Sequence, residues 1–436
     1  MKLNTTLAFI VLFALSACNN KMEKTGENWT PAHVEMKDME GKYRLYVNNQ
    51  EFYIKGAGCE GGDIKALAGH GGNTFRTWRV DNSKQTGEQV LDLARENGLM
   101  VVMGLNVALE RHGFDYNDTV KVREQYERLV KQVDKYKNHP ALLAWGIGNE
   151  LNLRSTNPKV WRAVNDIANY IHKNDGNHPT TTMLSGISKT DVDYIKEYCP
   201  EIDFISVQMY ADVVNLSTRL KDAGYKKPYL VSEWGATGHW EVGQTSWNAP
   251  IEQSSSEKAD AIKYRYENVI LKDDSLCMGS FVFLWGQKQE RTPTWYGLFS
   301  ESGEETEAID VLHYYWTGSW PENRAPRFHN ATFNEKGRNN NITTIPGEPC
   351  ICKCLVSDPD EDDISYKIEV LEESSDKREG GDIESRPQAI IIKDLTFTQD
   401  GFEFKAPDVP GAYRLFIYAS DGNNHVATFN FPFFVK

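Results

Sequence analysis

The sequence lacks an excess of positive charge. Its 436 residues include 48 Lys and Arg against 62 Asp and Glu, which gives a formal net charge of −14. A protein that binds a nucleic acid backbone presents clustered basic side chains to the phosphates, so nucleic acid is not an expected partner. The fractions of apolar residues (40%) and charged residues (25%) are those of a folded globular protein. They exclude collagen, a coiled coil and a wholly disordered chain.

Long apolar runs are also missing, apart from one at the N-terminus. Lys2 precedes an apolar stretch, Leu7–Leu15, followed by Ser16-Ala17-Cys18. This pattern predicts a secretory signal over residues 1–17, too short for a spanning helix. The ending resembles the bacterial lipobox, which implies acylation of Cys18. Residues 18–30 are polar and predict a tether. We therefore expect an exported lipoprotein at the outer membrane or cell surface, attached to the membrane only through the lipid on Cys18.

Signatures of metal ions and cofactors are scarce. The sequence has no CxxC with a nearby His pair at zinc spacing, and no Gly-rich phosphate fingerprint follows a predicted strand, so we expect neither metal nor cofactor. Cys350, Cys352 and Cys354 alternate as residues on one strand face do, which favours buried small side chains over a metal cluster. The alternating aspartates of residues 357–363 (SDPDEDD) suggest a calcium loop but lack its glycine, which favours a solvated turn.

What the sequence does contain is a regular alternation of short β-rich runs with helical stretches. A hairpin (Tyr43–Val47 and Glu51–Lys55) comes first. Eight predicted strands follow: Phe52–Ala57, Thr74–Trp78, Met100–Val107, Leu142–Gly148, Thr180–Leu184, Phe204–Tyr210, Tyr229–Trp234 and Ser280–Trp285. Predicted helices lie between and after them, at Asp63–Ala68, Gly87–Asn97, Thr119–Tyr136, Pro158–Lys173, Asp191–Tyr198, Leu216–Lys221, Glu257–Lys272 and Thr306–Tyr315. Eight pairs predict a (β/α)₈ TIM barrel. A doubly wound sheet, the competing fold, lacks its fingerprint here.

The alternation stops after Trp316. Residues 319–326 contain two prolines and predict a linker. From residue 327 to residue 436 the helical pattern disappears, and short β runs separated by turns predict an immunoglobulin-like β-sandwich. The expected organisation is therefore a hairpin and catalytic barrel over residues 31–318, the linker, and a C-terminal sandwich over residues 327–436.

Two glutamates end predicted strands of the barrel. Asn149-Glu150 ends the fourth strand, and Ser232-Glu233-Trp234 ends the seventh. Reactive residues of a TIM barrel lie at these carboxyl ends, so the two side chains are expected to face each other across the barrel mouth. Cleavage of a glycosidic bond with retention needs a proton donor and a carboxylate nucleophile. We expect a carboxyl separation of about 5–5.5 Å, whereas about 9 Å would indicate inversion.

These residues resemble the clan A retaining glycoside hydrolases. The resemblance implies that Glu150 is the acid/base, that Glu233 is the nucleophile and that Asn149 binds the 2-hydroxyl of the sugar. It also implies three supporting residues: Arg76, which would keep Glu233 ionised and oriented, Tyr210, which would hydrogen-bond the nucleophile, and Trp285, which would offer an aromatic floor to the sugar. Other tryptophans at or beyond strand ends are candidates for stacking on sugar rings, with a structural role left open: Trp78, Trp234, Trp240 and Trp247.

The chain as a whole resembles glycoside hydrolase family 158, which combines a signal, a compact clan A barrel and one immunoglobulin-like domain. That resemblance implies endo-action on β-1,3-glucans such as laminarin. We also expect a monomer. One departure concerns Gln208, which occupies the position where family 5 cellulases usually have His, two residues before Tyr210. Three alternatives remain open: an exo-acting glycosidase, a β-1,4-specific glucanase or mannanase, and a non-catalytic glycan-binding lipoprotein.

Overall fold

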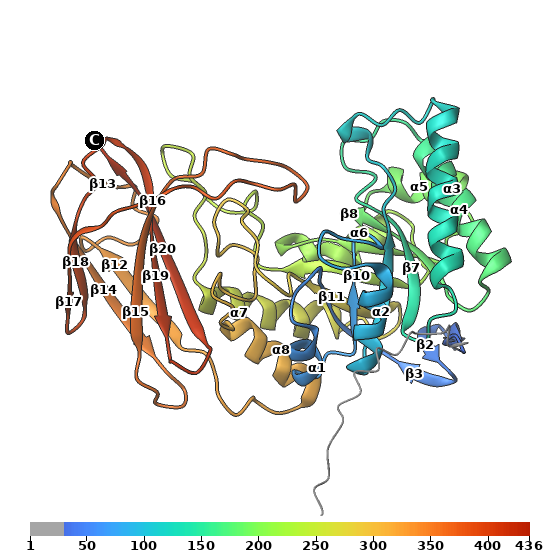
Figure 1. Ribbon diagram of the computed structural model, residues 1–436, viewed down its shortest axis with the longest axis horizontal. Coiled ribbons are helices and arrows are strands. Elements are labelled where there is room, and N and C mark those ends of the chain that lie inside the picture. Colours follow the sequence, from blue (N-terminus) through green and yellow to red (C-terminus); the bar gives the residue numbers. More distant parts are fainter. Residues whose placement is uncertain (1–29) are drawn as a thin grey trace, which may run out of the picture.

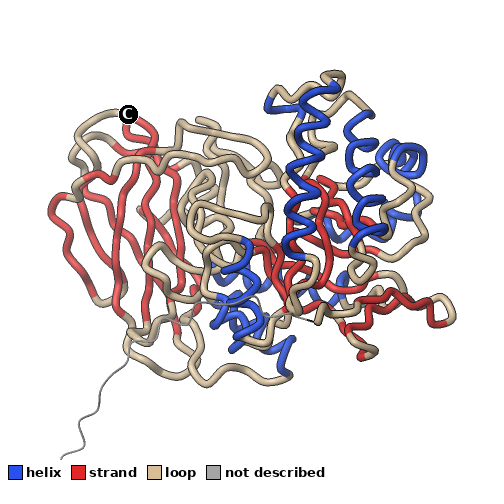
Figure 2. Tube along the Cα trace, turned by 45° about the vertical axis from the view of Figure 1, so that its right-hand side comes forward, coloured by secondary structure: helices blue, strands red, loops and turns tan. Residues whose placement is uncertain are grey.

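A computed structural model describes residues 30–436 of the chain (Figure 1). The predicted signal over residues 1–17, Cys18 and residues 18–29 of the predicted tether lie outside the described residues. No helix among the described residues is long and apolar enough to cross a membrane. The described chain forms a parallel β-barrel covered by helices and, beside it, a sandwich of two β-sheets (Figure 2). The predicted barrel and sandwich are thereby confirmed.

A small antiparallel sheet precedes the barrel. It has three strands, β1 (Val34–Met39), β2 (Lys42–Val47) and β3 (Gln50–Phe52), where the sequence predicted a two-stranded hairpin. The additional strand, β1, pairs with β2 along all of its six residues. Val34 and Leu45 are buried in a core that also contains residues of the barrel strands. This apolar contact holds the small sheet against the barrel.

Eight parallel strands form a closed barrel in the order β10-β11-β4-β5-β6-β7-β8-β9. The strands are β4 (Ile54–Gly58), β5 (Thr74–Arg76), β6 (Met100–Leu105), β7 (Leu142–Asn149), β8 (Thr180–Ser185), β9 (Phe204–Gln208), β10 (Tyr229–Gly235) and β11 (Cys277–Phe283). Most of their residues are buried, as expected for strands that have side chains inside the barrel and helices outside it.

The outer layer contains the helices α1 (Ile64–Gly69), α2 (Gly87–Glu96), α3 (Thr119–Tyr136), α4 (Lys159–Asn174), α5 (Lys189–Tyr198), α6 (Leu216–Asp222), α7 (Ser255–Arg265) and α8 (Glu307–Thr317). Short helical turns lie at η1 (Glu110–His112), η2 (Ala211–Asn215) and η3 (Tyr266–Ile270). Several helices begin at a residue whose side chain caps the first turn. Thr86, Ser188 and Ser254 each form a capping box at the start of α2, α5 and α7. These contacts satisfy backbone N–H groups that the helix leaves unpaired.

The C-terminal domain packs a four-stranded sheet against a five-stranded one. The first sheet contains β12 (Arg327–Phe333), β14 (Pro349–Ser357), β18 (Gly401–Lys405) and β17 (Lys393–Thr398); the second contains β13 (Ile342–Thr344), β20 (Val426–Val435), β19 (Gly411–Ser420), β15 (Ser365–Glu372) and β16 (Ala389–Ile390). Cys350 and Cys352 of β14 are buried in the core between the sheets, and Cys354 packs against it. The described cysteines are all free thiols.

Buried polar contacts join the sandwich to the barrel. Thr428 of β20 donates its backbone N–H to Ser255 of α7 at 2.8 Å, and Asn430 donates to Glu252 at 2.8 Å. Arg414 of β19, which is 1% exposed, donates to the Pro250 carbonyl at 2.7 Å. These polar groups are buried between the two domains, away from water. Separating the domains would break their hydrogen bonds, which costs free energy. The two domains therefore form one unit.

Candidate active site

The two glutamates lie at the same end of the barrel. Glu150 directly follows β7, Glu233 lies in β10, and these two strands are three positions apart around the barrel. Because the strands are parallel, their carboxyl ends meet at a single mouth. The sequence-based placement of both residues at this mouth agrees with the structure.

Glu233 is 6% exposed and accepts hydrogen bonds from several side chains. Arg76 of β5 forms an ion pair with Oε1. The same oxygen accepts from Trp78 Nε1 at 3.0 Å and from Gln208 Nε2 at 3.1 Å. Tyr210 donates its hydroxyl to the other oxygen, Oε2, at 3.0 Å. These four donors occupy both oxygens of the carboxyl group and fix its orientation.

Asn149 belongs to the same network. Its side-chain oxygen accepts hydrogen bonds from Arg76 Nη1 at 3.1 Å and from Gln208 Nε2 at 2.7 Å. Since both donors bind Oδ1, the amide nitrogen Nδ2 is left to donate to a ligand. Sequence reasoning treated Gln208 only as a departure from a family pattern and missed its place in the site. The available signal was strand alternation, because Gln208 and Tyr210 are two residues apart and point to the same side.

The backbone of Glu150 has an unusual conformation. Its φ angle is +52°, in the left-handed region that residues other than glycine rarely adopt. Two hydrogen bonds hold it there: Glu150 N donates to the Met183 carbonyl of β8 at 2.9 Å, and Leu153 N donates to the Glu150 carbonyl at 3.0 Å. Because the chain turns here, the direction of the Glu150 side chain does not follow the alternation of side chains along β7.

The two carboxyl groups have contrasting surroundings. Burial, and next the negative charge of Glu233, raise the pKa of Glu150 to about 7. Glu233, in contrast, is surrounded by Arg76 and three neutral donors. Near neutral pH Glu150 can therefore hold a proton, while the side chain of Glu233 is oriented by four donors. This pair can supply a general acid and a nucleophile at one site.

Aromatic rings surround the nucleophile. Trp78 contacts Phe283 edge-to-face at 5.9 Å between centroids, and Phe283 contacts Tyr210 at 6.0 Å. Trp240, in the loop after β10, contacts Tyr210 at 5.4 Å and is 59% exposed. The exposed ring of Trp240 suits contact with the apolar face of a sugar. Phe283 was not named as a site residue from the sequence, although it ends β11.

The structure corrects the stacking interpretation for three tryptophans. Trp285 is fully buried, donates Nε1 to the Asp63 carbonyl at 2.7 Å and fills space between the barrel and its helices. Trp234 is fully buried and stacks on Tyr266, because neighbouring strand residues point to opposite faces and Glu233 faces inward. Trp247 packs against the sandwich, 5.7 Å from the Phe434 ring.

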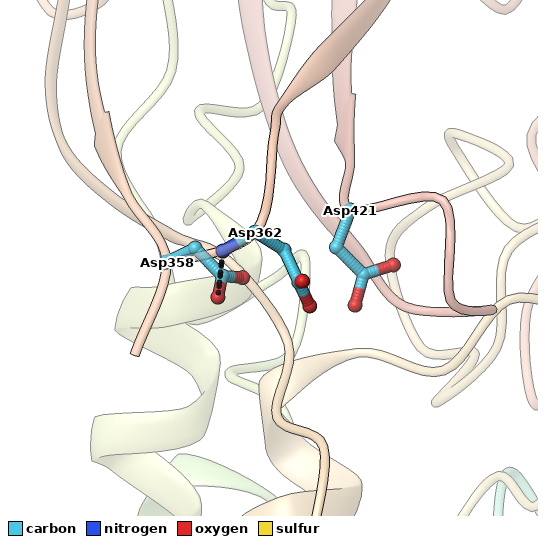
Figure 3. Close-up of side chains that lie close together, drawn as sticks. All are labelled: Asp358, Asp362 and Asp421. Atoms are coloured by element: carbon cyan, nitrogen blue, oxygen red, sulfur yellow. Dashed lines mark hydrogen bonds between the residues drawn. The ribbon is translucent and has the colours of Figure 1, made fainter. Parts of the chain in front are cut away.

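One group of three acidic side chains among residues 30–436 has a geometry suited to a metal ion. Oxygens of Asp358, Asp362 and Asp421 lie within 4.8 Å of one another, on loops of the sandwich (Figure 3). Asp358 Oδ1 accepts the backbone N–H of Asp360 at 2.8 Å and of Asp362 at 3.2 Å. These hydrogen bonds form a turn from Asp358 to Asp362, and Asp421 accepts hydrogen bonds of its own from Asn323 Nδ2 at 2.7 Å and from the backbone N–H of Asn423 at 2.7 Å. It lies in the sandwich, outside the network around the two glutamates, and we assign it no role in the chemistry.

A family model places this geometry in a known group. The model for the TIM barrel domain of glycosyl hydrolases family 2 matches residues 38–275, more than half of the chain. The chain belongs to this family. The match to a family 2 barrel agrees with the clan A resemblance. The comparisons therefore support family 2 and not family 158.

The similar proteins are longer glycosidases. The β-galactosidase of Lactococcus lactis is 25% identical over 196 residues, which cover 43% of this chain and 18% of that enzyme. A β-D-glucuronidase from Dictyoglomus thermophilum matches with a TM-score of 0.50 and 19% identity, over 66% of this chain and 54% of the other. A Bacteroides uniformis β-glucuronidase matches with a TM-score of 0.51 and 12% identity, over 92% and 48%. The chain spans less than a fifth of the Lactococcus enzyme, and these structural likenesses concern the fold.

Proposed function

We propose that this family 2 barrel protein is a retaining β-glycoside hydrolase, with Glu150 as acid/base and Glu233 as nucleophile. The observation that carries the proposal is the contrast between the two carboxyls: Glu150 has its pKa raised to about 7, and Glu233 is held by Arg76 and three further donors. A pair of carboxyl groups with separate environments at one barrel mouth is what double displacement needs.

The first chemical step forms a covalent intermediate. A carboxylate oxygen of Glu233 attacks the anomeric carbon while Glu150 gives its proton to the glycosidic oxygen, so that the bond to the leaving sugar breaks. Asn149 Nδ2 is placed to bind a hydroxyl of the same sugar. In the second step Glu150, now ionised, takes a proton from water, the water oxygen attacks the anomeric carbon, and Glu233 leaves as a carboxylate. Two inversions give net retention.

For the substrate we propose a neutral β-glucan, cleaved internally at β-1,3 linkages as in laminarin. The partly exposed Trp78 and the exposed Trp240 support a sugar polymer, because they offer apolar faces next to the nucleophile. The β-1,3 preference and endo-action rest on the family 158 resemblance of the sequence. The similar β-galactosidase and β-glucuronidases instead favour a second candidate, an exo-acting β-glycosidase of the same clan.

A reducing-sugar assay with β-1,3-glucan, β-1,4-glucan, mixed-linkage glucan and mannan tests the substrate. We expect release from laminarin, with a ladder of oligosaccharides at early times. Glucose alone from the start would indicate exo-action, and release from β-1,4-glucan or mannan alone would overturn the β-1,3 proposal. Glu233→Gln is the matched control, because it changes one oxygen to nitrogen and should abolish release. Equal release by this variant would contradict the mechanism, whereas sugar binding by a wild-type protein that cleaves no glycan would indicate a binding protein.

A further inference from the structure

The segment between β15 and β16, residues 373–388, leaves the sandwich and reaches the loops at the barrel mouth. It runs from the sandwich toward the barrel in Figure 1, where the orange-red chain passes above α7. We call it the β15–β16 loop. Its contacts with the barrel come from the loops that follow four barrel strands: β11, β6, β7 and β10.

One end of this contact is a buried ion pair. Arg291, in the loop after β11, pairs with Glu384, and their side chains are 10% and 0% exposed. The Arg291 backbone N–H also donates to Glu384 Oε2 at 2.5 Å, and Lys288 Nζ donates to the Gly381 carbonyl at 2.6 Å. A charged pair buried this deeply is costly to break singly, so it holds the loop in place.

The other end of the contact lies beside η1, in the loop after β6. Arg111 donates from Nη1 to Asp382 Oδ2 at 3.0 Å and from Nη2 to Asp382 Oδ1 at 3.3 Å. His112 Nε2 lies 3.0 Å from the same Oδ2. Two hydrogen bonds from one guanidinium group fix both the position and the orientation of the Asp382 side chain. Asp382 and Glu384 are only two residues apart, so the loops after β6 and β11, whose strands are three positions apart in the barrel, both reach this short segment.

Short series of contacts connect the attachments with both proposed catalytic glutamates. A Cβ added at Gly380 would lie 2.9 Å from Leu153 Cδ2, and Leu153 N donates to the Glu150 carbonyl. Lys288 Nζ is 5.7 Å from the centroid of the Phe283 ring. That ring contacts Trp78, which donates to Glu233. The loop therefore packs against residues that themselves contact the two glutamates or their partners.

A large aliphatic side chain is exposed between the two attachments. Ile383 is 90% exposed, whereas its neighbours Asp382 and Glu384 are held by arginines of the barrel. An exposed isoleucine on a fixed segment leaves apolar surface in water unless a ligand covers it. The apolar face of a sugar unit has the matching chemistry.

We propose that the β15–β16 loop is a wall of the substrate cleft and that Ile383 contacts a sugar unit of the polymer beyond the cleaved linkage. The inference rests on the proposed function and adds a role for the sandwich: this domain completes the cleft and favours long substrates. A short aryl glycoside does not reach this wall, so the loop contributes to the recognition of polymers more than to the cleavage step.

The test compares a polymer with a small substrate in one pair of variants. For Ile383→Ser, we expect the ratio of kcat/KM for laminarin to kcat/KM for 4-nitrophenyl β-D-glucoside to fall about three- to tenfold, mainly through KM. Ile391→Ser is the matched control, since Ile391 is also an exposed isoleucine of the sandwich (87% exposed) and lies between β16 and β17. Its ratio should equal that of the wild type.

A protection experiment tests directly whether a bound oligosaccharide covers residue 383. In the Glu233→Gln protein, laminarihexaose should slow the alkylation of Ile383→Cys by N-ethylmaleimide at least twofold, read by mass spectrometry of that peptide, and leave Ile391→Cys unaffected. An unchanged kinetic ratio together with no protection would overturn the inference. If the wild type cleaves neither laminarin nor the aryl glucoside, the proposed function fails instead, and the loop inference falls with it.

Discussion

Gln208 Nε2 donates hydrogen bonds to both Asn149 Oδ1, at 2.7 Å, and Glu233 Oε1, at 3.1 Å. A single amide group therefore fixes the residue that is expected to bind the sugar relative to the proposed nucleophile. Arg76 bridges the same two side chains. Gln208 and Arg76 thus each contact both Asn149 and Glu233. A change at Gln208 should therefore disturb catalysis more than folding.

We expect Gln208→Leu to lower kcat/KM about 10- to 100-fold, because it removes two donors to polar groups of the site. Gln208→His retains a ring N–H and should lose less. The melting temperatures of both variants provide the control for folding. Equal activity of Gln208→Leu and the wild type would show that the amide does not position the nucleophile.

The pH dependence should report the ionisation of Glu150. Its pKa is raised to about 7, and only the protonated form can donate to the leaving group. We therefore expect kcat/KM to fall as the pH rises through about 7. Glu150→Ala should lose about 10²- to 10⁴-fold in rate on laminarin, and less on a 4-nitrophenyl glycoside, whose leaving group needs little protonation. A basic limb that persists unchanged in Glu150→Ala would assign it to another group.

The contact between barrel and sandwich should weaken in base. Burial raises the pKa of Asp310 from its ordinary value of 3.8 to about 7. The protonated side chain therefore stabilises the fold at low pH, and this contribution is lost as the pH rises from about 3.8 to about 7. Burial alone would lower the pKa of His425, but its hydrogen bond to Glu305 and the charge of Asp310 raise it to about 9. The protonated imidazolium therefore stabilises the fold below about pH 6.5, and this contribution is lost as the pH rises to about 9.

We expect the melting temperature to fall on the order of 5 °C between pH 6.5 and pH 9. His425→Gln should be less stable at pH 6.5 and show a flatter profile over this range. Calorimetry at several pH values gives the measurement. If the variant and the wild type follow the same slope, His425 is not the group that titrates.

Barrel and strand ends could be predicted from the sequence because local patterns determine them. Alternation of β-rich and amphipathic runs predicted the strand that precedes Glu150 and the strand that contains Glu233. The additional strand β1 escaped this reasoning, since its residues (VEMKDM) alternate weakly and pair through contacts with β2. Trp285 was misplaced because its surroundings are built by residues distant in sequence, such as Asp63 and Trp316.

The site itself was predictable only in part. Arg76 and Tyr210 were found through the clan resemblance, and the structure brings both to Glu233. The β15–β16 loop could not be found, because no pattern in a polar segment indicates that Asp382 and Glu384 reach arginines of another domain. Such contacts depend on how two domains pack, which sequence periodicity does not encode.

We propose that the chain is exported and attached to a membrane through a lipid on Cys18. When the full chain is expressed in a Gram-negative bacterium, it should partition into the detergent phase of Triton X-114 and incorporate labelled palmitate. Cys18→Ala should lose the label and move to the aqueous phase. Labelling of Cys18→Ala to the same extent as the wild type would exclude Cys18 as the site of acylation.

The identity of the nucleophile is the central claim, and covalent trapping tests it most directly. A 2-deoxy-2-fluoro-β-glucosyl fluoride slows the second step more than the first, so the glycosyl ester should accumulate on the wild type. Peptide mass spectrometry should then find the added fluorosugar on Glu233, and Glu233→Gln should remain unlabelled. A label on Glu150 instead, or an active enzyme that turns over this reagent with inversion and without any adduct, would contradict the account.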